Sequence, residues 1–142
     1  MAATDVRLNH ISRESPNIAR LAAFYEEVLG FERIEAPNFG DIEVIWLRIS
    51  PELSLHLIQR DPQSKLPEGP YGAPPGSFVT DPKLLPRGHH ICFSVSNFDD
   101  FVQSLKDKGI ETFLTRQPEG KTKQLFFFDV DGNGLEVVNR EN

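Results

Sequence analysis

Three histidines and one glutamate stand at spacings that suit a metal site. His10 and His56 are 46 residues apart, and the same separation of 46 recurs between His90 and Glu136. Neutral imidazoles and carboxylates are ordinary ligands of zinc, nickel, iron and manganese, but an ion needs three or four of them from different segments. The repeated spacing therefore predicts two copies of one module, each supplying two ligands to a shared cavity.

The composition is that of one ordinary globular domain. The 142 residues are 39% hydrophobic and 25% charged, and no apolar run is long enough to span a bilayer. A formal charge of -6 offers no broad cationic surface for nucleic acid or anionic lipid. We therefore expect a small-molecule substrate, with no nucleic acid and no membrane as partner.

Cys92 is the only cysteine, which excludes an intrachain disulfide. Its place inside an apolar run predicts a buried thiol. The first residues show neither the basic segment nor the apolar stretch of an export signal. A cytoplasmic location is the expectation.

The first half reads as a strand, a helix and three strands. Alternation over residues 6–12 sends His10 and every second neighbour to one face. Ser15 and the proline after it form a strong helix start, and Gly30 can close the helix, so residues 16–29 are predicted helical. Further strands are predicted at residues 32–35, 43–49 and 53–59.

The second half repeats this order. A shift of 80 residues lays His10 over His90 and His56 over Glu136. The helices require a smaller offset, with Phe24 over Phe101, which places a short deletion before the second helix. The predicted elements are a strand at 89–95, a helix from 98 ending at Gly109, and strands at 111–114, 124–128 and 135–139.

Three further features bear on the site. Residues 61–88 contain seven of the eleven prolines and read as an extended connector, either a lid over a site or a surface strap. His89 should point away from the face of His90 because side chains alternate along a strand. Residues 129–134 resemble a calcium loop at first, but the spacing favours a turn between strands.

Several segments resemble the vicinal oxygen chelate superfamily and, within it, glyoxalase I. They are Asn9-His10-Ile11, Phe24 to Phe31, Gly88 to Ile91 and Asp129 to Glu136. The resemblance implies one α+β domain over residues 1–142, made of two tandem βαβββ modules (6–60 and 89–139) joined by the connector 61–88. It also implies that His10, His90 and Glu136 bind a divalent metal, whereas His56 stands where glyoxalase I has glutamate.

By this resemblance, the protein is a metal-dependent lyase or isomerase that acts on a small oxygenated carbonyl compound through a metal-stabilised enediolate. Glu136 is the implied general base, and the metal is Zn, Ni, Mn or Fe. Glutathione is a cosubstrate in the family, but Glu14 and Arg60 replace the family's arginine and asparagine and argue against its use here. The resemblance also implies a homodimer, and the candidate substrate-binding residues are Arg13, Arg60, Lys121 and Lys123.

Two other classes of function stay open. Two histidines and one glutamate also form the triad that holds Fe(II) in oxygenases, although a fourth ligand at His56 would fill a position that substrate or oxygen needs. Proteins of the bleomycin-resistance branch hold a ligand between aromatic walls without turnover, and the eleven phenylalanines and Trp46 permit such a pocket. A glutathione-independent enzyme of specialised metabolism is a variant of the first hypothesis.

Overall fold

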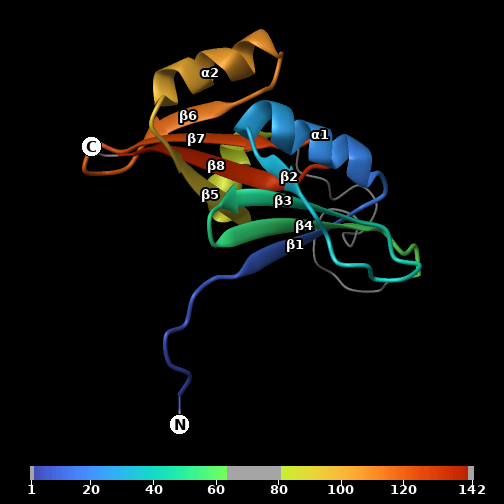
Figure 1. Ribbon diagram of the computed structural model, residues 1–142. Coiled ribbons are helices and arrows are strands. Elements are labelled where there is room, and N and C mark those ends of the chain that lie inside the picture. Colours follow the sequence, from blue (N-terminus) through green and yellow to red (C-terminus); the bar gives the residue numbers. More distant parts are fainter. Residues whose placement is uncertain (1, 64–80, 141–142) are drawn as a thin grey trace. The chain divides into compact units, whose positions relative to one another are not determined.

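The computed structural model describes residues 2–63 and 81–140, which form two compact units (Figure 1). Unit 1 denotes residues 2–63 and unit 2 denotes residues 81–140, and each is considered by itself. The lid or strap predicted for the connector falls mostly on residues 64–80, outside the described residues. In the part of the chain that is described, no helix is long and apolar enough to cross a membrane.

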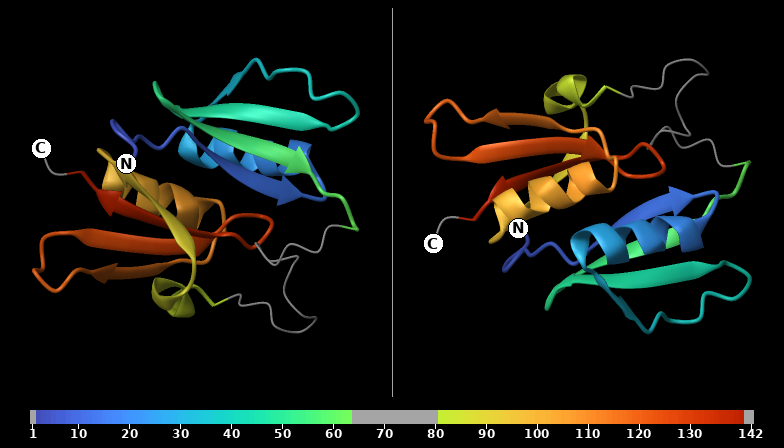
Figure 2. Two further views of the ribbon diagram at one scale, coloured as in Figure 1. Left: turned by 90° about the horizontal axis from the view of Figure 1, so that it is seen from below. Right: turned by 90° about the horizontal axis from the view of Figure 1, so that it is seen from above.

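Unit 1 is a βαβββ module, as predicted. Its sheet has the strand order β1-β4-β3-β2, with β1 parallel to β4 and the other neighbours antiparallel. The helix lies across one face of this sheet (Figure 2). The elements are β1 (His10–Ser15), α1 (Ile18–Leu29), β2 (Glu32–Ile34), β3 (Val44–Ser50) and β4 (Leu53–Gln59).

The first strand begins later than the alternation in residues 6–12 indicated. β1 pairs with β4 from His10 opposite Ser54, and the last hydrogen bond beyond it joins Ser54 N–H to Asn9 O. The described residues before Asn9 pair with no strand, because β4 itself begins at Leu53. Val6 and Leu8 are accordingly exposed, and the predicted start at residue 6 is wrong.

The helix of unit 1 also begins later than predicted, at Ile18 and not at residue 16. The side chain of Asn17, not of Ser15, caps it by accepting a hydrogen bond from Arg20 N–H at 3.1 Å. Ser15 instead accepts from Asn17 N–H at 3.1 Å, which turns the chain from β1 into the cap. Gly30 closes the helix in the left-handed conformation, at φ 73°, as predicted.

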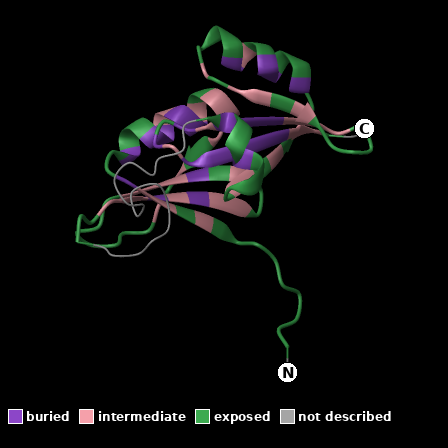
Figure 3. Ribbon diagram, turned by 180° about the vertical axis from the view of Figure 1, so that it is seen from behind, coloured by how far each residue is buried: buried purple, intermediate pink, exposed green. Residues whose placement is uncertain are grey.

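Unit 2 has the same architecture. Its strand order is β5-β8-β7-β6, with β5 parallel to β8. Figure 3 shows the buried residues of its helix along the side that faces the strands. The elements are η2 (Pro82–Arg87), β5 (His90–Val95), α2 (Phe98–Asp107), β6 (Phe113–Arg116), β7 (Lys123–Phe128) and β8 (Gly134–Asn139).

The strand registers confirm the internal duplication. Ser12 pairs with His56 in unit 1, and Cys92 pairs with Glu136 in unit 2, so both pairs obey the shift of 80 residues. Trp46 lies opposite His56 just as Phe126 lies opposite Glu136. The two sheets are therefore copies at the level of individual side chains.

The helices keep the same shift at their starts, which corrects the smaller offset expected for them. α1 begins at Ile18 and α2 at Phe98, and the buried residue Leu21 corresponds to Phe101. The shortening lies later, because the left-handed glycines Gly30 and Gly109 differ by 79 positions. The aromatic match of Phe24 with Phe101 was misleading because both residues only share the buried side of an amphipathic helix.

The last part of the connector is helical, not extended. η2 is a 3-10 helix whose first turn is capped by the side chain of Asp81, which accepts from Lys83 N–H at 3.0 Å. Leu85 is buried and approaches Gly134 so closely that a Cβ at 134 would lie 2.4 Å from Leu85 Cδ1. Gly134 therefore allows η2 to pack against the start of β8.

The loop between β7 and β8 is a turn, as predicted. Asp129 Oδ1 accepts hydrogen bonds from the N–H groups of Asp131 and Asn133, both at 2.9 Å. Asn133 Nδ2 also donates to Asp129 Oδ2 at 2.8 Å. This carboxylate thus organises the backbone of its own turn.

Candidate functional site

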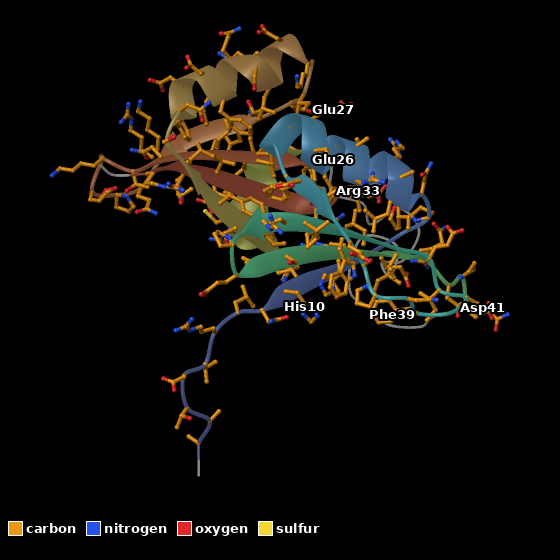
Figure 4. The ribbon with its side chains drawn as sticks, in the orientation of Figure 1. His10, Glu26, Glu27, Arg33, Phe39 and Asp41 are labelled. Atoms are coloured by element: carbon orange, nitrogen blue, oxygen red, sulfur yellow. The ribbon has the colours of Figure 1, made fainter. Side chains whose placement is uncertain are left out.

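The candidate ligands lie on the sheet faces opposite the helices. In unit 1 the buried row of Leu55 and Leu57 faces α1, so the alternate residue His56 points the other way. Strand register puts His10 in the same alternate row of β1. Figure 4 shows His10 and Phe39 on the side of the strands away from α1. We call the face of each sheet opposite its own helix the distal face.

Three rings form a parallel stack on the distal face of unit 1. The imidazoles of His10 and His56 are 4.1 Å apart between centroids, with planes 9° apart. The indole of Trp46 covers the other side of His56 at 3.6 Å and 8°. Desolvation by burial, followed by the charge that His10 can carry, lowers the pKa of His56. The stack favours neutral His56, the form that binds metals.

A neighbouring side chain orients His10. Its Nδ1 lies 2.8 Å from Asn9 Oδ1, which is an acceptor and so selects the tautomer that carries the proton on Nδ1. The Nε2 atom then keeps its lone pair. Hydrogen bonds of this kind usually fix histidines that ligate metals.

The distal face of unit 2 holds a histidine and a carboxylate in direct contact. His90 Nε2 lies 3.1 Å from Glu136 Oε2, and His90 Nδ1 lies 2.9 Å from Gly88 O. Gln124 Nε2 donates to Glu136 Oε1 at 2.8 Å. Glu136 is only 6% exposed, so these contacts replace most of its hydration. In His10 and His90 alike, Nδ1 is thus held by a neighbouring oxygen, and Nε2 of His90 faces the Glu136 carboxylate.

The separation of His90 and Glu136 suits two neighbouring ligands of one ion. Ligand atoms about 2.1 Å from a divalent ion and about 90–110° apart are separated by about 3.0–3.4 Å. Among the described residues, no group of three or more histidine, cysteine, aspartate or glutamate side chains that could hold a metal ion is formed. The set of four ligands therefore stays a prediction.

Cys92 is exposed, so the expectation of a buried thiol is wrong. The apolar run around it alternates, with Ile91 and Phe93 in the other row, and Cys92 stands beside Glu136 on the distal face. Desolvation and then the Glu136 carboxylate raise the pKa of the thiol to about 12. The sulfur is therefore a thiol, not a thiolate, near neutral pH.

The predicted substrate-binding arginines differ in their surroundings. Arg60 lies 3.1 Å from the Glu14 carboxylate, which neutralises it at the end of the distal face. Arg13 pairs with Leu57 in register, so its side chain leaves β1 on the face of α1, away from His10. Its buried Nε has no hydrogen-bond partner among the described residues.

The predicted substrate-binding lysines are also directed elsewhere. Lys123 Nζ lies 3.0 Å from Asp99 and 5.8 Å from the centre of the Phe98 ring, both at the start of α2. Lys121 is exposed in the turn between β6 and β7. There the Glu119 carboxylate accepts from the N–H groups of residues 121 and 122, at 3.3 and 2.6 Å. These bonds, chiefly that from residue 122, lower the pKa of Glu119.

Three residues near the ligands were not among the predicted site residues, although Trp46 was considered as part of an aromatic pocket. Asn9, Trp46 and Gln124 contact His10, His56 and Glu136, respectively. Trp46 carried a usable signal, because the shift of 80 aligns it with Phe126 and the neighbouring strand brings it beside His56. No spacing rule indicated Asn9 or Gln124, since their roles depend on side-chain rotamers.

Two βαβββ units, each with its own pair of candidate ligands, define a two-module fold. Comparison with known proteins assigns this fold to a family. The family model described as Glyoxalase/Bleomycin resistance protein/Dioxygenase superfamily matches residues 7–137. The chain belongs to this superfamily, which confirms the fold class and the resemblance predicted from the sequence.

Individual relatives agree with this assignment. The chain is 28% identical over 134 residues to Glyoxylase I 4 of Arabidopsis thaliana, covering 93% of this chain and 70% of that protein. It is 32% identical over 112 residues to the mitochondrial methylmalonyl-CoA epimerase of Homo sapiens, covering 75% and 56%. The structure of a lactoylglutathione lyase from Agrobacterium tumefaciens superposes with a TM-score of 0.65 and 18% identity, covering 96% of each chain. The last similarity shows the fold alone.

Proposed function

We propose that the protein is a metal-dependent lyase or isomerase of the glyoxalase I type, acting on a small carbonyl compound with two adjacent oxygens. The observation that carries the proposal is the buried Glu136, held by His90 and Gln124 at 3.1 and 2.8 Å. A carboxylate fixed beside a metal-capable histidine is suited to proton transfer at a carbon next to a carbonyl group. Relatives named as a glyoxalase and an epimerase support an enzymatic role.

The residues that would hold the metal are His10, His56, His90 and Glu136, within one chain or across a homodimer. Their chemistry fits Zn, Ni, Mn or Fe, and three neutral imidazoles with one carboxylate leave a net charge of about +1 on a divalent ion. Such an ion supplies Lewis-acid stabilisation of negative charge on the substrate oxygens.

Glu136 is the proposed general base. Gln124 donates to Oε1 and so holds the carboxylate plane, while Oε2 faces His90. Because the site has one ligand carboxylate, the same group would remove the proton and return it on one face of the substrate. Cys92 remains protonated beside it and does not compete as a base.

An Fe(II) oxygenase is the second candidate, and the stack on His56 is the observation that favours it. If His56 only packs between His10 and Trp46 and does not bind the metal, the remaining ligands are two histidines and one glutamate. That set leaves coordination positions for substrate and oxygen.

Metal analysis and turnover test these proposals together. Protein purified without added metal should contain a divalent ion, and loaded protein should convert methylglyoxal, assayed with and without glutathione. Glu136→Gln should lower turnover by at least about a hundredfold, since general bases typically contribute that much. Less than about a tenth of an equivalent of metal, with no gain on reconstitution, overturns the metalloenzyme. Oxygen consumption by the iron form, together with unchanged metal binding in His56→Gln, supports the oxygenase instead.

A further inference from the structure

The distal face of unit 1 continues from the histidines into an exposed aromatic surface. The ring of Phe39 lies 6.1 Å from Trp46, at a tilt of 41°, and Trp46 in turn covers His56. Four rings thus form one row across the face: Phe39, Trp46, His56 and His10. Phe39 is 48% exposed and nearby Ile42 in the same loop is 56% exposed. An apolar group beside the histidines could therefore bury surface that the chain leaves in water.

The charges around this surface are either negative or already paired. The loop of residues 35–43 carries Glu35, Asp41 and Glu43 and no lysine or arginine. Arg48, which shares the distal face with Trp46, lies 3.6 Å from Glu32. Arg60 at the other end of the face is paired with Glu14, as described above. From residues 2–63, this face therefore offers an anionic ligand no arginine or lysine that is not already paired with a carboxylate.

The turn between β6 and β7 of unit 2, which contains Gly120 and Lys121, already holds a carboxylate of the protein. Its amides at residues 121 and 122 are bonded by the Glu119 carboxylate, so an incoming carboxylate would have to displace a carboxylate of the chain itself. Lys123 is directed to Asp99 on α2. The backbone N–H groups of residues 121 and 122 and the ammonium of Lys123 are thus engaged within the protein, whereas the side chain of Lys121 is exposed.

We propose that the substrate is an uncharged carbonyl compound with an aromatic or bulky apolar substituent, which packs on Phe39 and Trp46 while its adjacent oxygens face the histidines. Only one part of this inference, the placement of the substrate's oxygen atoms, rests on the proposed function. The apolar contact and the charge selection are properties of unit 1 and require no metal.

Three small probes distinguish the effect of an aromatic ring on binding from the effect of a negative charge. 2-Hydroxyacetophenone carries a phenyl ring and two adjacent oxygens without charge, benzoylformate has the same ring with a carboxylate, and hydroxyacetone lacks the ring. Binding to the metal-free full chain can be followed through the indole N–H signal of Trp46, because the chain has one tryptophan. 2-Hydroxyacetophenone should bind at least about tenfold more tightly than either other probe, as expected for one buried ring.

A matched pair of variants tests the location. Phe39→Ala should weaken 2-hydroxyacetophenone binding several-fold and leave hydroxyacetone unchanged. Leu114→Ala removes a comparably exposed apolar side chain, 54% exposed, from β6 and should change neither. The proposal is overturned if benzoylformate or S-hexylglutathione binds as tightly as 2-hydroxyacetophenone, if no probe shifts the Trp46 signal, or if Phe39→Ala has no effect. A protein that passes this test but binds no metal would refute the proposed function and leave the apolar site standing.

Discussion

The indole of Trp46 lies face to face with the imidazole of His56, 3.6 Å between centroids and 8° between planes. The equivalent ring in unit 2, Phe126, instead meets His90 edge-on, at 5.5 Å and 87°. Both aromatic residues sit opposite the later ligand of their unit in the strand register. In each unit an aromatic ring therefore contacts a candidate histidine ligand, by stacking in unit 1 and edge-on in unit 2.

Removal of the Trp46 ring should weaken metal binding. Trp46→Leu loses the stacking contact, worth about 0.5–1.5 kcal/mol, and so should raise the Kd for Zn²⁺ by about two- to tenfold. Trp46→Phe keeps a stacking ring and should lie close to the wild type. Competition with a chromophoric chelator measures the Kd values, and equal values for the leucine and phenylalanine variants would show that the stack does not position His56.

The lowered pKa of His56 predicts a loss of stability in acid for the metal-free protein. Unfolded His56 takes up a proton near pH 6.5, whereas the folded residue does so only at lower pH. The unfolded state therefore binds more protons below about pH 6.5, and the free energy of unfolding falls as the pH drops through this window. Urea unfolding with a chelator present, at about pH 7 and about pH 5, measures the change.

The variant His56→Gln should lose less stability over that interval, because its unfolded state gains no extra proton at this position. His89→Gln is the matched control, since His89 is exposed and precedes β5. An unchanged pH dependence in His56→Gln would contradict the prediction.

The thiol of Cys92 should react slowly despite its exposure. With a pKa of about 12, almost none of it is thiolate at pH 8, so alkylation by iodoacetamide should be far slower than that of free cysteine. Glu136→Gln removes one cause of the raised pKa and should accelerate the reaction, although desolvation, the larger cause, persists. Mass spectrometry after timed alkylation gives the rates, and equal rates for the two proteins would exclude the influence of Glu136.

Gly134→Ala should destabilise unit 2. Its Cβ would lie 2.4 Å from Leu85 Cδ1 and 2.7 Å from the backbone O of His89, and the backbone atom has little freedom to move. Overpacking of this kind costs about 1–3 kcal/mol. Gly88→Ala is the control, because its Cβ would meet only ordinary contacts of 3.5 Å or more at a φ of -87°. Thermal unfolding compares the two, and equal midpoints would argue against the close approach of η2.

The order of elements was predictable because it depends on local pattern. Amphipathic spacing and Gly30 located α1, and alternation located β3 and β4 to within a residue or two. The boundaries that failed were those set by a partner. β1 starts where β4 can pair with it, and residue 17 became the cap only because Ser15 is buried at the end of that strand.

By itself, the sequence determined the duplication and the four candidate ligands, because a repeat of 46 and a shift of 80 are properties of residue order. The tertiary structure decided which partner each side chain has. Pairing of β3 with β4 stacks Trp46 on His56, pairing of β5 with β8 sets Cys92 beside Glu136, and Glu14 and Asp99 neutralise Arg60 and Lys123. Such contacts join residues far apart in the chain and depend on rotamers and strand register, which residue spacing alone does not determine.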